Sequence, residues 1–153
     1  MSQVEERLRE LGIELPSPIA PVANYVPFVI SGSLLHISGQ ISTDAQGGIK
    51  GTVGTDVDLE TAVRAARICG INLLTQMKIA CEGDLDRVRR VVKLGGFVQA
   101  GPDFIDIPKV INGCSDLMVE AFGDKGRHAR SAVGVYRLPL GFAVEVDAIV
   151  EIA

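Results

Sequence analysis

Two β-rich runs and a turn make up the stretch HARSAVGVYRLPLGFAVEVDAIV, residues 128–150, from which the fold can be worked out. Residues 131–138 and 143–152 carry the apolar and β-branched side chains typical of strands. Between them, residues 138–141 read Leu-Pro-Leu-Gly and place a proline and a glycine where the chain must turn. This pattern predicts a β-hairpin.

Strand periodicity divides the side chains of this hairpin between two faces, because successive side chains point in opposite directions. If the valine-rich faces meet the core, the far face carries Arg130, Ala132, Gly134, Glu145 and Asp147. Two interpretations remain open. Cross-strand ion pairs on a solvated face explain the charges. Alternatively, the small side chains leave a hollow in which Arg130 binds a carboxylate, while Glu145 orients or deprotonates a water.

Outward from this stretch, hydrophobic spacing and capping residues predict the other elements. They are a helix at 2–12, a proline-rich extended segment at 15–27, a hairpin at 26–30 and 34–37, a glycine-rich loop at 44–55, a helix at 58–80, a strand at 90–99 with Gly95 and Gly96 as a bulge or close approach, and a helix at 108–123. This order predicts an α+β sandwich in which two main helices cover one face of a mixed sheet.

Length and composition indicate a single domain over residues 1–153, with residues 1–12 as an N-terminal helical extension. Hydrophobic residues make up 47% of the chain, charged residues 22%, and the net charge is −4. The negative charge disfavours nucleic acid as a partner, and a basic cluster near residue 90 is interpreted as a solvated edge. Neither a secretory leader nor a membrane-spanning run is recognisable.

Three cysteines, Cys69, Cys81 and Cys114, form no paired motif, so neither disulfides nor a metal site is expected. Their positions within or at the ends of the predicted helices favour core thiols over nucleophiles. Reduced thiols and the absence of a leader favour a cytoplasmic location.

Two segments together resemble the RidA (YjgF) family, also labelled L-PSP endoribonuclease. One is the stretch at 128–150, with its Arg-Ser pair and Leu-Pro turn, and the other is GSLLHISGQIS at 32–42, preceded by Tyr25. The resemblance extends from about Asn24 to Val150. It implies the chorismate-mutase-like α+β sandwich, assembled as a homotrimer with sites in the clefts between subunits.

Members of that family hydrolyse reactive enamines and imines such as 2-aminoacrylate, without a metal or cofactor. The resemblance implies that Arg130 binds the substrate carboxylate and that Glu145 positions or activates the attacking water. It also implies substrate-binding positions at Tyr25, Ser38, Gly39 and Ala132, the last through its backbone carbonyl. A non-catalytic module binding a small carboxylate in the same cleft is the alternative function, and a ribonuclease is the weakest.

The chain departs from the family pattern in four places. Ala132 stands where a cysteine is common, and His128 stands where a proline is usual. The N-terminal helix through Gly12 and the extra residues at 99–107 make the chain longer than compact family members. Because His128 lies beside Arg127 and Arg130, it is disfavoured as a cation, and we expect it outside the pocket. His36, which alternates with apolar residues in a strand, is interpreted as a surface or structural histidine.

Overall fold

A computed structural model describes residues 1–18 and 23–153, so part of the expected extended segment at 15–27 lies outside the described residues. The helices and strands are α1 (Gln3–Glu10), β1 (Phe28–Ser31), β2 (Leu34–Ile41), α2 (Leu59–Ala80), β3 (Val88–Gln99), α3 (Ile107–Phe122), β4 (Ala129–Val135) and β5 (Val144–Ile152). Three short 3₁₀ helices, η1 (Leu85–Arg87), η2 (Gly123–Gly126) and η3 (Pro139–Gly141), join them.

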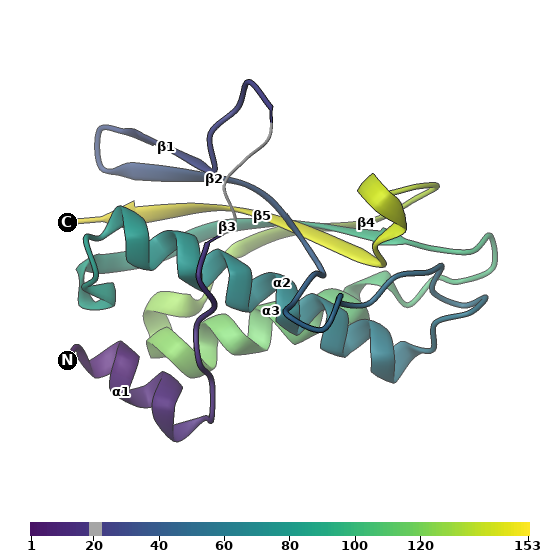
Figure 1. Ribbon diagram of the computed structural model, residues 1–153, viewed down its shortest axis with the longest axis horizontal. Helices are drawn as coiled ribbons and strands as arrows, with labels where there is room; N and C mark the ends of the chain where they lie inside the picture. Colours follow the sequence, from purple (N-terminus) through teal and green to yellow (C-terminus); the bar gives the residue numbers. More distant parts are fainter. Residues whose placement is uncertain (19–22) are drawn as a thin grey trace.

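The strands form one mixed five-stranded sheet in the order β1-β2-β5-β3-β4. All neighbours are antiparallel except β3 and β4, which run parallel. Both long helices, α2 and α3, lie on one face of this sheet, and none of α1, α2 and α3 lies on the opposite face, which we call the helix-free face (Figure 1). The alternating burial along β5 reflects this, since every second side chain, from Val144 to Ile152, is buried beneath the helices. The predicted α+β sandwich with a mixed sheet is confirmed.

The predicted hairpin at 131–138 and 143–152 is wrong, although both strands exist. β3 lies between β4 and β5, pairing with each, so that Phe97 lies opposite both Val133 and Glu145. The physical reason is the crossover from β3 through α3, which returns the chain parallel to β3 at the sheet edge. The turn η3 then carries the chain past β3 to β5, with Leu140 in a left-handed conformation (φ 59°).

A glycine of α2 and a glycine of α3 lie at the contact between these two helices. A Cβ atom on Gly70 would lie 2.9 Å from Leu117 and 3.2 Å from the Cys114 sulfur. Conversely, a Cβ on Gly113 of α3 would collide with the backbone carbonyl of Val63 of α2. The two glycines therefore set the distance between the helices, and this brings α3 against β3 and β4.

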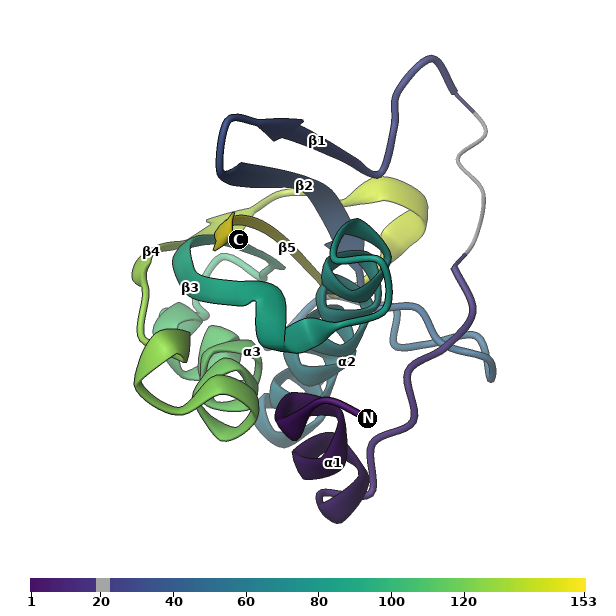
Figure 2. The same ribbon diagram turned by 90° about the vertical axis from the view of Figure 1, so that its left-hand side faces the viewer.

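The predicted N-terminal helix is confirmed as α1, which forms a third layer below the two long helices (Figure 2). Ser2 and Glu5 make the expected capping box, and Leu8 is buried. The Asp86 carboxylate accepts hydrogen bonds from the first amides of α1, those of Gln3 and Val4. Lys78 of α2 pairs with Glu5 at 2.7 Å.

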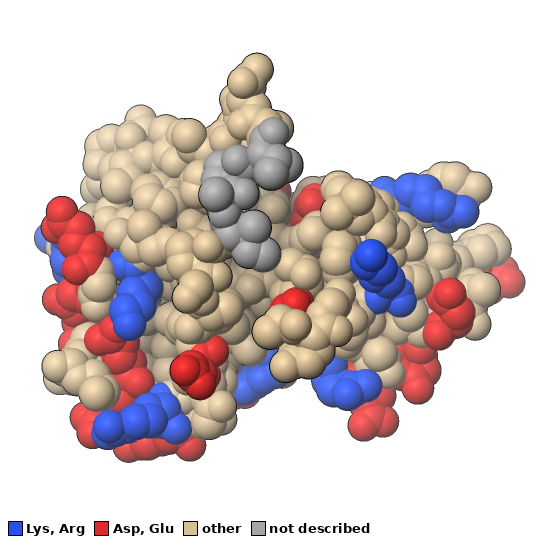
Figure 3. Space-filling view, viewed as in Figure 1, with Lys and Arg blue, Asp and Glu red and all other residues tan. Residues whose placement is uncertain are grey.

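Charged side chains of both signs cover the helical layers, whereas the surface around the β1–β2 hairpin carries almost none on the face shown in Figure 3. Within the described part of the chain, no helix combines the length and apolar character needed to cross a membrane.

Candidate functional site

Arg130 lies on the helix side of β4, where α3 supplies its hydrogen-bond partners. Its Nη1 donates to Asn112 Oδ1 at 2.8 Å and to Ser115 Oγ at 3.1 Å. Asn112 and Ser115 are three residues apart, so they share one face of α3. Neither was predicted. Both are polar residues at the border of the apolar stripe of the helix, and their i, i+3 spacing is the sequence feature that could have identified them.

His128 is connected to Arg130 through Ser115, so the expectation that it lies outside this site is wrong. Its Nε2 lies 2.8 Å from Ser115 Oγ, and its Nδ1 lies 2.6 Å from the carbonyl oxygen of Gly126. All of the side chains in this chain of hydrogen bonds except Asn112 are partly buried. We call Asn112, Ser115, His128 and Arg130 the Arg130 cluster.

The guanidinium of Arg130 has no carboxylate counter-ion among residues 1–18 and 23–153. The ion pairs of this part of the chain, with N···O distances up to 4.0 Å, involve other cations. The partners of Arg130 are a neutral amide and a neutral hydroxyl. A partly buried cation held by neutral acceptors retains its full charge for an external anion.

The small residues of β4 lie beside Arg130, next to α3 and the core. Gly134 lies on the same face of the strand, where a Cβ would meet Ile107 at 3.3 Å and Ala100 at 3.5 Å. Ala132, between Gly134 and Arg130, packs against the core. Small side chains at these positions therefore leave room for α3 to pack against β4.

Glu145 lies on the opposite, helix-free face of the sheet, so the expectation that it shares a face with Arg130 is wrong for a single chain. The strand register explains this, since Glu145 and Val133 both lie opposite Phe97, and Arg130 has the other parity on β4. Burial, with a smaller contribution from Asp147, raises the pKa of Glu145. Burial also raises the pKa of Asp147, partly offset by a hydrogen bond from the Gly95 amide.

Gly39 lies against Glu145, and Ser38 precedes it in β2. A register shift in β2 between Ile37 and Gln40 places Gly39 against the carboxyl group, where a Cβ would lie 2.8 Å from Glu145 Cδ. Ser38 Oγ donates to the carbonyl of Val26 at 2.8 Å, which ties β2 to the segment carrying the exposed Tyr25. We call Ser38, Gly39 and Glu145 the Glu145 cluster.

All three cysteines are buried and unpaired, which confirms their interpretation as core thiols. Burial raises the pKa of Cys114 to about 12, so this thiol stays protonated at neutral pH although Arg130 is nearby. Across the described ranges, the His, Cys, Asp and Glu side chains form no group that could hold a metal ion.

Comparison with known proteins identifies close relatives over almost the whole chain. The family described as YjgF/chorismate mutase-like, putative endoribonuclease, matches residues 5–151. Protein TCP17 of Trypanosoma cruzi is 49% identical over 152 residues, covering 98% of this chain and 94% of that protein.

Two solved structures share the fold in detail. Atu1372 of Agrobacterium tumefaciens, a protein of unknown function, is 50% identical with a TM-score of 0.91, covering 98% of this chain and 93% of the other. A Shewanella oneidensis protein described as a putative endoribonuclease is 35% identical with a TM-score of 0.92. The match covers 97% of this chain and 99% of the other. The chain therefore belongs to the YjgF/chorismate-mutase-like family.

Proposed function

We propose that this protein hydrolyses small enamines and imines that carry a carboxylate, without a cofactor, and that Arg130 binds this carboxylate. The observation that supports the proposal most is the Arg130 guanidinium, which is partly buried, held by two neutral acceptors and free of any described counter-ion. A guanidinium binds a carboxylate through two parallel hydrogen bonds, which fixes the orientation of the substrate as well as its position.

The chemistry requires little beyond positioning. The carbon of a protonated imine is already electrophilic, so a water oxygen bonds to it while the π electron pair moves to nitrogen. Glu145 takes one proton from this water and then returns it to the nitrogen. The carbon–nitrogen bond breaks, the remaining hydroxyl loses its proton to the departing amine, and the products are a keto acid and ammonium. The raised pKa of Glu145 suits this role, because it makes the ionised carboxylate a stronger base.

Because Arg130 and Glu145 lie on opposite faces of one sheet, we propose that a site containing both is shared by two chains of a homotrimer. The helix-free face supports this assembly. Val29, Leu34 and Val133 are exposed there, at 53%, 37% and 45%. Apolar side chains exposed on an uncovered sheet are typical of an interface. In such a site the Arg130 cluster of one chain would face the Glu145 cluster of its neighbour.

Keto-acid release from enzymatically generated 2-aminoacrylate tests the proposal. Arg130→Ala removes both charge-assisted hydrogen bonds and should lower kcat/KM at least about a hundredfold. Arg130→Lys should stay well below the native protein, because an ammonium cannot form the planar pair. Arg64→Ala, which removes an exposed arginine of α2, is the control. A native protein that adds nothing to the spontaneous rate across several imines would overturn the hydrolase.

A carboxylate-binding module is the second candidate, because a single chain places Arg130 and Glu145 on opposite faces. Calorimetry with keto acids would then show binding that depends on Arg130 without turnover.

The name endoribonuclease, which the family description carries, predicts cleavage of single-stranded RNA that is lost in Arg130→Ala. The net charge of −4 and the mixed charges in Figure 3 disfavour that activity.

We also propose a cytoplasmic location, which the three buried free thiols support.

A further inference from the structure

When the His128 ring is neutral, the hydrogen bonds between Gly126 and Arg130 have one consistent direction, because the Gly126 carbonyl only accepts and Arg130 only donates. The Gly126 carbonyl only accepts, so Nδ1 of His128 carries a proton and donates to it at 2.6 Å. In the neutral ring Nε2 is then an acceptor, and the Ser115 hydroxyl donates to it at 2.8 Å. This leaves the lone pairs of Ser115 Oγ for Arg130, which only donates.

This chain of hydrogen bonds determines which edge of Arg130 is available to a ligand. Nη1 has two hydrogens, and Asn112 and Ser115 take both of them. Within residues 1–18 and 23–153, the hydrogen bonds of the Arg130 side chain are these two, so Nε and Nη2 have no partner there. These two nitrogens form one edge of the planar guanidinium, and their spacing matches the two oxygens of a carboxylate.

We propose that Ser115 and His128 are positioning residues that hold Arg130 so that its Nε/Nη2 edge receives the ligand carboxylate side-on. This inference rests on the proposed carboxylate site and assigns to it two residues that the resemblance does not name. Without the Ser115 hydroxyl, one Nη1 hydrogen loses its acceptor and the guanidinium can turn about its remaining bond to Asn112. Ligand binding must then also order the arginine side chain, which lowers the affinity for the carboxylate.

Pyruvate, a small keto acid, is the probe, and its Kd is measured by calorimetry for four variants. Ser115→Ala removes a hydrogen bond to the charged guanidinium and should weaken binding about tenfold. His128→Gln disturbs the partner that orients the Ser115 hydroxyl and should weaken binding in the same direction. Ser115→Thr keeps the hydroxyl and should bind within about threefold of the native protein. Asn112→Asp places a carboxylate beside Nη1, and the resulting ion pair should compete with pyruvate. Asp116→Asn, on the exposed side of α3, is the control.

Thermal unfolding and imine turnover separate positioning from a structural role. Positioning predicts that Ser115→Ala raises KM more than it lowers kcat, with an almost unchanged Tm and rescue by Ser115→Thr. A lowered Tm with no rescue would show that the hydroxyl is merely structural and would overturn the inference.

Arg130→Ala distinguishes the two proposals. If it binds pyruvate as well as the native protein does, the carboxylate site itself is wrong. If it loses binding while Ser115→Ala and His128→Gln bind normally, only the positioning role is wrong.

Discussion

Two glycines on strands adjacent to β5 allow its carboxylates to lie against the backbone. A Cβ on Gly39 would lie 2.8 Å from Glu145 Cδ, and a Cβ on Gly95 would lie 2.5 Å from Asp147 Oδ1. Close approach was one of two interpretations of Gly95, and it is confirmed; the register shifts of β3 lie elsewhere. This crowding partly removes water from both carboxyl groups, and the desolvation raises both pKa values.

The raised pKa of Glu145 makes the stability of the protein pH-dependent. The folded state binds the proton more tightly than the unfolded state, so stability falls as pH rises from the ordinary pKa of 4.5 through the folded-state pKa. Glu145→Gln should therefore increase the free energy of unfolding at neutral pH. The gain should be below about 1 kcal/mol, since the group is partly exposed and screened by solvent.

Urea unfolding at neutral pH and at a pH below 4.5 measures this effect. The advantage of Glu145→Gln should vanish in acid, where the carboxyl group is protonated in both states. Glu14→Gln, in an exposed loop, controls for the loss of one charge. An advantage of equal size at both pH values would show that desolvation of the carboxylate is not its cause.

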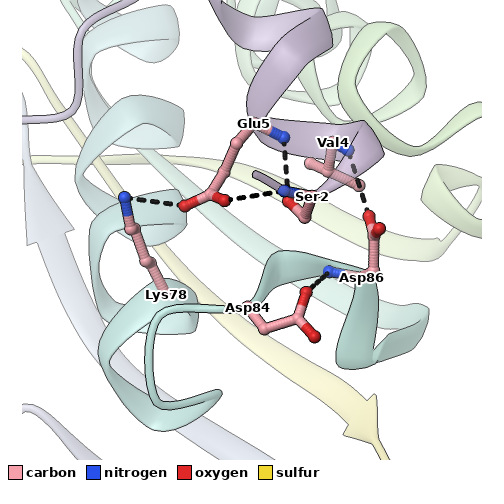
Figure 4. A network of polar contacts seen from close by, with 6 residues as sticks. All are labelled: Ser2, Val4, Glu5, Lys78, Asp84 and Asp86. Carbon is pink, nitrogen blue, oxygen red and sulfur yellow. Dashed lines mark hydrogen bonds and ion pairs between the residues drawn. The ribbon is translucent and has the colours of Figure 1, made fainter.

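At the scale of the elements, α1 is held by groups from outside its own sequence (Figure 4). Asp86 accepts from Val4 N at 3.1 Å, the contact drawn in Figure 4, and from Gln3 N at 2.9 Å. Both contacts lie at the positive end of the helix dipole. A helix of eight residues is marginal by itself in water. Its order therefore depends on this capping, on Lys78 and on the burial of Leu8.

Asp86→Asn should loosen α1 without unfolding the sheet. The amide is isosteric, but it has one acceptor oxygen in place of two and no charge. We expect a loss of about 1 kcal/mol, seen as roughly fivefold faster amide hydrogen exchange across Gln3–Glu10. Asp116→Asn is the matched control. Unchanged exchange in α1 would show that Asp86 does not stabilise the helix, and faster exchange throughout β3 would show a global effect.

The helices were predictable from the sequence because their determinants are local. Asp58 caps α2 through the Thr61 amide, and Ser2 and Glu5 cap α1, as their spacing indicates. Strand partners are not local. The alternation along β5 is the same whether its neighbour is β4 or β3, so the sequence pattern could not exclude a hairpin.

For the whole molecule, that one error in strand order changes the proposed site. The motif identified Arg130 and Glu145, but the face that each occupies depends on β3 lying between their strands. His128 was misjudged for a similar reason, since its partner Ser115 lies on a different element. The sequence motif could therefore nominate candidate residues, whereas their grouping in space depended on the tertiary structure.

A site divided between two chains makes a prediction that a site within one chain does not. Arg130→Ala and Glu145→Gln should each be inactive alone, yet complement one another in a mixed trimer. A site is intact where a Glu145→Gln chain supplies its Arg130 cluster and an adjacent Arg130→Ala chain supplies its Glu145 cluster. Random mixing in equal amounts gives about a quarter of sites with both groups intact.

The most direct measurement is imine hydrolysis by the two variants after they are unfolded together and refolded as a mixture. The native protein, refolded in the same way, is the reference. We predict recovery of about a quarter of its rate, against almost none for either variant refolded alone. A mixture as inactive as its separate components, beside a fully recovered native protein, would contradict a site shared between Arg130 of one chain and Glu145 of the next.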